Sequence, residues 1–60
     1  MMMSLKVNKV YDIEGTPMKY LYDDGFWKVF EETYTSMQRR YVSEEIERKN
    51  LSLYDFRKDV

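Results

Sequence analysis

The stretch from Met18 to Glu32 reads MKYLYDDGFWKVFEE and decides the fold. It contains five of the ten aromatic residues of the chain, and the pair Asp24-Gly25 divides it in two. Asp-Gly is a preferred pair for a two-residue hairpin turn, because both turn positions need positive φ and Gly adopts it without strain. Apolar residues recur on both sides of this pair. We therefore expect a central β-hairpin.

The pairing register of this hairpin has two alternatives. With a two-residue loop, Tyr22 faces Trp27 and Tyr20 faces Val29, and the following residues share one face: Met18, Tyr20, Tyr22, Trp27 and Val29. The opposite face then carries Leu21, Phe26 and Phe30. With a three-residue loop the register slips by one residue, and the Phe row joins the Tyr row. Both registers leave apolar side chains on both faces. We expect core or dimer contacts from Tyr20, Tyr22, Trp27, Val29 and Phe30.

The size of the chain suggests that it does not fold alone. Sixty residues allow one domain at most, expected over residues 1–60 with a disordered terminus at 1–4. A chain this short buries only about 60% of its unfolded surface, so small domains often depend on disulfides, metals or oligomerisation. The sequence has no Cys and no His, which removes disulfides and the common zinc sites. We therefore expect a homodimer or an obligate partner.

The remaining segments predict one helix and two further strands. Leu5–Ile13 is typical of a first strand, and residues 14–17 form a connection because Gly and Pro interrupt the pattern. Thr33 or Thr35 can cap a helix that continues to Asn50, either unbroken or interrupted near Val42-Ser43 by a second cap. Leu51–Phe56 alternates again and predicts a last strand. The expected class is α+β, a dimeric three- to four-stranded antiparallel sheet with one or two short helices in the order β-β-β-α-β.

Composition gives little support for catalysis or for nucleic-acid binding. The carboxylate pairs Asp23-Asp24, Glu31-Glu32 and Glu44-Glu45 are expected to be solvated structural groups, as charged residues usually are. Arg39 and Arg40, with Tyr34 and Tyr41, could contact phosphates and bases. However, ten basic and eleven acidic residues nearly cancel, which leaves a thin basic footprint. We expect no catalytic residues, no metal site and no cofactor. No apolar run approaches the roughly 20 residues of a membrane span.

Several short motifs resemble the small uracil-DNA glycosylase inhibitor of protein-primed Bacillus phages. Tyr11-Asp12-Ile13 is similar to a Tyr-Asp-Val in the first strand of that family, and Met18, Leu21 and Asp23–Gly25 are similar to its Met, Leu and Asp-Asp-Gly turn. The resemblance covers about residues 10–60. It continues through an aromatic strand, an Asp-Glu-Ile that corresponds to residues 44–46, and a final strand with a similar end. Met37 stands where the family has a helical Phe, whereas Tyr41 matches its Tyr four residues on.

The resemblance implies a non-enzymatic phage protein that inhibits the host uracil-DNA glycosylase by DNA mimicry in the host cytoplasm. In that family a dimer builds a hydrophobic pocket that traps the apolar finger of the enzyme, and acidic side chains stand in for phosphates. On this basis the expected partner-binding residues are Met37, Tyr41, Tyr34, Glu31, Glu32, Glu44 and Glu45. No nucleic acid or membrane is an expected partner. The alternatives are a dimeric adaptor that inhibits another host protein, and a small nucleic-acid-binding module.

Overall fold

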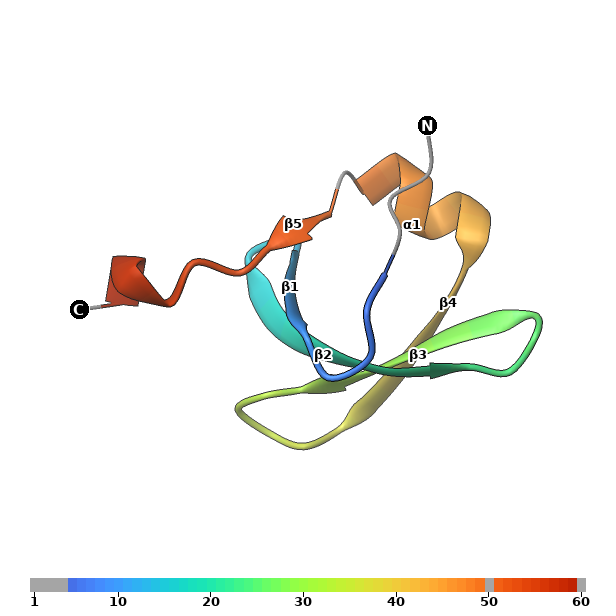
Figure 1. Cartoon of the computed structure of the whole chain (residues 1–60), viewed down its shortest axis with the longest axis horizontal. Helices are drawn as coiled ribbons and strands as arrows, with labels where there is room; N and C mark the ends of the chain where they lie inside the picture. Colours follow the sequence, from blue (N-terminus) through green and yellow to red (C-terminus); the bar gives the residue numbers. More distant parts are fainter. Residues whose placement is uncertain (1–4, 50, 60) are drawn as a thin grey trace.

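The architecture is an antiparallel sheet with one short α-helix. The computed structural model describes residues 5–49 and 51–59. In this part of the chain the elements are β1 (Val10–Ile13), β2 (Thr16–Asp23), β3 (Trp27–Glu32), β4 (Gln38–Val42), α1 (Ser43–Lys49), β5 (Ser52–Leu53) and a 3-10 helix, η1 (Phe56–Asp59). The sheet has the order β4-β3-β2-β1-β5 (Figure 1). The predicted α+β class and antiparallel sheet are confirmed, with one strand more than expected.

The first strand is shorter than predicted because the chain turns before it. Asn8 adopts a φ of 71°, a left-handed conformation that Asn tolerates better than most residues. Strand β1 therefore begins at Val10, and Tyr11 and Ile13 are buried while Val7 is 56% exposed. The predicted connection at residues 14–17 is a tight two-residue turn instead. Glu14 and Gly15 both have positive φ, as a type I′ hairpin turn requires.

Neither predicted register of the central hairpin is correct. The Asp23 carboxylate accepts the Gly25 N–H at 2.8 Å, and the Asp24 carboxylate accepts the Trp27 N–H at 2.8 Å. The Asp24 N–H donates to the Trp27 carbonyl at 3.1 Å and closes the loop around Gly25, which has a φ of 101°. The turn therefore sits one residue further along the chain than Asp24-Gly25.

A bulge between Tyr20 and Tyr22 then shifts the register back by one residue. Tyr22 pairs with Val29 and Tyr20 pairs with Phe30, with the irregularity between Tyr20 and Tyr22. Because a slip of one residue exchanges the two faces of a strand, the bulge separates side chains that an ideal ladder would group. Tyr20 and Phe30 share the buried face, as the three-residue register predicted and the two-residue register did not, whereas Tyr22 faces the other side.

The long helix predicted from Thr35 to Asn50 is wrong in its first half. Strand β4 occupies Gln38–Val42 and pairs with β3, with Arg39 opposite Phe30 and Tyr41 opposite Lys28. The helix begins at Ser43, as the predicted second cap suggested, and the Glu45 carboxylate accepts the Val42 N–H at 3.5 Å. Thr33 and Thr35 lie in the turn between β3 and β4 and cap no helix. Asn50, the predicted helix end, lies outside the described residues.

The core lies on one face of the sheet, here called the core face, under α1. Its buried cluster consists of Tyr11, Ile13, Met18, Tyr20, Phe30 and Ile46. Phe30 is the centre of this cluster: it is 0% exposed, and its ring centroid lies 5.3 Å from that of Tyr20 and 6.5 Å from that of Tyr11. Helix α1 contributes Ile46, and the Lys49 ammonium pairs with the Glu14 carboxylate in the first hairpin turn. Helix α1 covers this face together with Leu5 and Leu51, which pack against the same cluster.

The end of the chain runs away from the sheet. Strand β5 pairs with β1 over two residues, so the predicted last strand Leu51–Phe56 is much shorter than expected. Beyond β5 the chain leaves the body of the molecule and ends in η1 (Figure 1). Tyr54 and Phe56 pack edge to face with ring centroids 4.9 Å apart, and Phe56 is 59% exposed.

Candidate functional site

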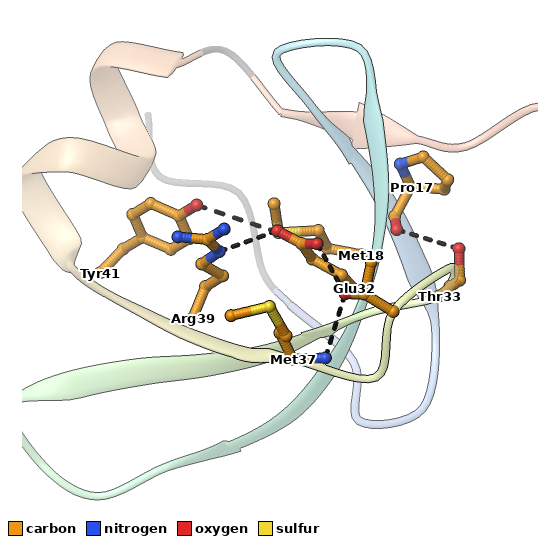
Figure 2. A network of polar contacts seen from close by, with 8 residues as sticks. Pro17, Met18, Glu32, Thr33, Met37, Arg39 and Tyr41 are labelled. Atoms are coloured by element: carbon orange, nitrogen blue, oxygen red, sulfur yellow. Dashed lines mark hydrogen bonds and ion pairs between the residues drawn. The ribbon is translucent and has the colours of Figure 1, made fainter.

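Glu32 holds together the turn between β3 and β4. Its carboxylate accepts a hydrogen bond from the Arg39 guanidinium at 2.8 Å (Figure 2). The same carboxylate accepts one from the Thr35 hydroxyl at 2.8 Å. Its N–H donates to the Met37 carbonyl, and its carbonyl accepts the Ser36 N–H. Hydrogen bonds from Thr35 and then Arg39 lower the pKa of Glu32, because they favour its charged form. Glu32 therefore has a structural role.

Two of the four glutamates of the predicted acidic rim are already engaged by other groups of this chain. Glu32 is committed to Thr35 and Arg39, and Glu45 accepts a main-chain N–H from Val42. Glu31 lies on β3 beside Lys19 and Gln38, whereas Glu44 lies in the first turn of α1. The four glutamates thus lie on two elements, and two of them already bind groups of this chain.

Met37 and Tyr41 do not line one helical pocket. Tyr41 packs against the core: its ring centroid lies 5.8 Å from that of Phe30, and its hydroxyl is 3.9 Å from the Met18 sulfur (Figure 2). Burial raises the pKa of Tyr41, because it disfavours the charged phenolate. Met37 is 55% exposed and precedes β4. Four residues of extended chain separate the two by about 13 Å. The helix that was expected to carry both residues is therefore absent, since residues 38–42 form β4 and α1 begins at Ser43.

The proposed nucleic-acid set is also separated by the fold. Arg39 pairs with Glu32, and Tyr41 is turned to the core. Tyr34 lies in the turn after β3 and is 75% exposed. Arg40 lies on the opposite face of β4 from Arg39, since neighbouring residues of a strand alternate. Of these four residues, Arg39 and Arg40 line a common groove, whereas Tyr41 packs against the core.

A different surface gathers aromatic and charged side chains on the side of the sheet away from the core, here called the outer face. Its strand residues are Lys19, Tyr22, Trp27, Val29, Glu31, Gln38, Arg40 and Val42. Tyr22 is 50% exposed, and the neighbouring Phe26 at the hairpin tip is 65% exposed. Phe26 packs edge to face on Trp27 with ring centroids 5.0 Å apart. Val29 is buried in the middle of this face.

The Arg40 guanidinium lies over the Trp27 ring, 4.9 Å from its centroid. This cation–π contact holds the long side chain against the sheet. A groove of about 280 Å³ runs beside it, lined by Tyr22, Asp24, Val29, Gln38, Arg39 and Arg40. Sequence reasoning missed the Arg40–Trp27 contact because it depends on a β3–β4 register, and residues 38–42 were assigned to a helix.

The depressed pKa of Glu32 predicts a pH dependence of stability. A carboxylate with a lowered pKa in the folded state stabilises the fold above its unfolded pKa, and this stability is lost as the pH falls through the folded pKa. The free energy of unfolding should therefore decrease below about pH 4.5, the ordinary range of Glu. Chemical denaturation from pH 6 to pH 2 measures it.

Glu32→Gln tests this prediction, and Glu47→Gln is its matched control. Glu47 is exposed on α1 and takes part in none of the ion pairs of the described residues. Glu32→Gln should reduce the loss of unfolding free energy at acidic pH. Asp23, whose pKa is lowered by its hydrogen bond from Lys28, accounts for another part of that loss. An identical loss of unfolding free energy at acidic pH in wild type and Glu32→Gln would contradict the role given to Glu32.

The described residues contain no group of three or more His, Cys, Asp or Glu side chains that could hold a metal ion. No helix in residues 5–49 and 51–59 is long and apolar enough to cross a membrane. The Asp23-Asp24 pair is exposed and holds the hairpin turn, in agreement with the structural role expected for it.

Comparisons with protein-family models, with curated proteins and with solved structures found no match to this chain.

Proposed function

We propose that this chain works by binding another protein through its outer face and performs no chemical step itself. The observation that carries the proposal is a pair of exposed aromatic side chains, Tyr22 on that face at 50% exposure and Phe26 at the adjoining hairpin tip at 65%, beside the half-buried Trp27. Tyr and Trp are enriched at protein interfaces, where they combine large contact area with a polar tip. The core face is already covered by α1, so the outer face is the surface that remains for a partner.

The proposed partner is the host uracil-DNA glycosylase, in the host cytoplasm. Support comes from the resemblance, and the Asp23–Gly25 motif that carries much of it forms the tip of the hairpin next to Phe26. In this proposal the apolar finger of the enzyme meets the outer face in place of a Met37/Tyr41 pocket. Glu31 and Glu44, which have no partner in the described part of the chain, would stand in for phosphates.

A homodimer is part of the proposal. Leu53 and Phe56, in the C-terminal segment, are 60% and 59% exposed and offer apolar surface to a second copy. A second copy could cover part of it without using the groove beside Arg40. Sedimentation equilibrium should give a mass of two chains at micromolar concentration, and a single-chain mass at all concentrations would contradict the dimer.

A uracil-excision assay tests the partner directly. A host glycosylase acting on uracil-containing DNA should lose its activity when the protein is in excess over the enzyme. Addition of more DNA should restore activity if the protein occupies the DNA-binding cleft. Undiminished excision with excess protein would refute the glycosylase as the partner and leave only the more general binding proposal.

A further inference from the structure

The outer edge of β4 is open in the described part of the chain. Strand β4 lies at the end of the sheet, and β3 is the neighbour with which it pairs. The Glu32 N–H donates to the Met37 carbonyl, so Met37, Arg39 and Tyr41 direct their main-chain groups toward β3. Gln38 and Arg40 then direct theirs outward. An unpaired row of N–H and C=O groups is a template for another strand.

The end of this edge is closed by the protein itself. Val42 also directs its N–H away from β3, and the Glu45 carboxylate of α1 accepts it at 3.5 Å. This contact limits the open part to Gln38 and Arg40 and the turn before them. The edge therefore has room for a short extended segment of about four to five residues, the length of strand that β4 itself presents.

The side chains at this edge determine which strand can pair there. In the one symmetric antiparallel register that pairs all five residues of β4 with a second copy, Arg40 lies directly opposite Arg40 of that copy. Like charges directly opposite each other destabilise a strand pair, and charged residues at an edge protect a sheet from self-association. The β4 edge therefore disfavours a second copy of this chain.

The same side chains favour an acidic segment. Arg40 makes none of the ion pairs of the described residues, whereas Arg39 is paired with Glu32. Arg40 is held against Trp27 at one wall of the groove, and Val29 and Tyr22 supply apolar surface beside it. A carboxylate placed opposite Arg40 can accept a charge-assisted hydrogen bond, and an apolar neighbour two residues away reaches the groove.

We infer that the β4 edge binds an extended segment of the partner protein that carries a Glu or Asp opposite Arg40 and an apolar residue two positions away. Main-chain hydrogen bonds to Gln38 and Arg40 supply affinity, and the groove beside Arg40 supplies specificity, as in other cases of strand addition. The inference rests on the proposed function only in taking the partner to be a protein. It holds for any protein that offers such a segment.

A titration of the full chain with short synthetic peptides tests this inference without any glycosylase. The probe is a capped seven-residue peptide with the sequence Thr-Val-Thr-Glu-Thr-Val-Thr. At about 1 mM peptide, a range suited to weak strand addition, the Gln38 and Arg40 amides of the isotope-labelled protein should shift and become protected from hydrogen exchange. The Arg39 and Tyr41 amides, already directed toward β3, should gain much less protection.

Two control peptides separate the main-chain and side-chain contributions. A peptide with Lys in place of Glu should bind at least about fivefold more weakly, since it places like charges opposite each other. A peptide methylated on alternate main-chain nitrogens should lose binding. Arg40→Glu should reverse the preference between the Glu and Lys peptides, whereas Arg48→Glu on the exposed surface of α1 should not.

Absence of protection at Gln38 and Arg40, or equal affinity for the Glu and Lys peptides, would overturn the inference. Failure of the excision assay alone would leave it intact, because the peptide titration contains no enzyme. Conversely, inhibition of the glycosylase with no peptide binding at β4 would retain the partner and move its contact to another surface. The two experiments therefore report separately on the partner and on the docking edge.

Discussion

Phe30→Ala is expected to unfold most of the molecules at 25 °C. Phe30 is fully buried and contacts the rings of Tyr11, Tyr20 and Tyr41. Removal of a buried Phe side chain costs about 3–5 kcal/mol, because contact surface is lost and a cavity remains. Domains of this size have a total stability of only about 3–9 kcal/mol at 0.05–0.15 kcal/mol per residue. Chemical denaturation followed by circular dichroism measures the loss.

Phe26→Ala is the matched control for Phe30→Ala. The two residues are of the same type and lie four positions apart, but Phe26 is 65% exposed at the hairpin tip. Surface substitutions usually change stability by less than about 0.5 kcal/mol. Equal destabilisation by the two variants would contradict the assignment of the core face and would favour one of the registers predicted from sequence.

Tyr41→Ala is expected to destabilise the fold by about 2–4 kcal/mol, less than Phe30→Ala because its side chain is half-buried. Its ring packs against Phe30, its hydroxyl contacts the Met18 sulfur, and the Lys49 ammonium lies 5.5 Å from the ring centroid. Met37→Ala should leave stability nearly unchanged, since Met37 is 55% exposed. Thermal and chemical denaturation of both variants measure the difference.

The same two variants also distinguish the binding site that the resemblance implies from the packing seen in the structure. A helical Met37/Tyr41 pocket would make both residues binding groups and neither a core residue. A Tyr41→Ala protein that unfolds at the same denaturant concentration as wild type would therefore contradict the packing described here. A strong loss of glycosylase inhibition in Met37→Ala would return the binding site to the position that the resemblance implies.

Sequence reasoning identified the central hairpin but not its register. The aromatic alternation around Asp24-Gly25 was sufficient to predict two antiparallel strands. The register depends on how the Asp23 and Asp24 carboxylates bind the N–H groups of the turn, and on a bulge beside Tyr22. The alternation of apolar residues around Asp24-Gly25 cannot distinguish these arrangements, because Asp-Gly is compatible with several turns.

The segment Gln38–Val42 shows why the helix prediction was wrong. Its residues are mostly good helix formers, but helix propensities differ by only a few tenths of a kcal/mol per residue. Strand β3 has Phe30 at its centre and gains a full ladder of main-chain bonds when β4 pairs with it. Ser36, with a φ of 62°, reverses the chain and makes that pairing local. Tertiary pairing therefore outweighed propensity.

The candidate site was less predictable than the fold. An aromatic excess beyond the needs of one core was evident from composition, and the structure places part of that excess, Tyr22 and Phe26, at the surface. The identity of the residues beside it could not be predicted, because Arg40 reaches Trp27 only across the β3–β4 ladder. Conversely, the acidic pairs looked equivalent in sequence, and hydrogen bonds to Thr35 and Arg39 distinguish Glu32 from Glu31.

The most direct test of the central claim is to map the face that contacts the glycosylase. Isotope-labelled protein is titrated with unlabelled enzyme, and signals are followed at Tyr22, Phe26 and Arg40 on the outer side and at Met37 and Thr35 beside the turn after β3. We predict strong changes for the first group and small ones for the second. Changes confined to Met37 and Thr35, or none in either group, would contradict it.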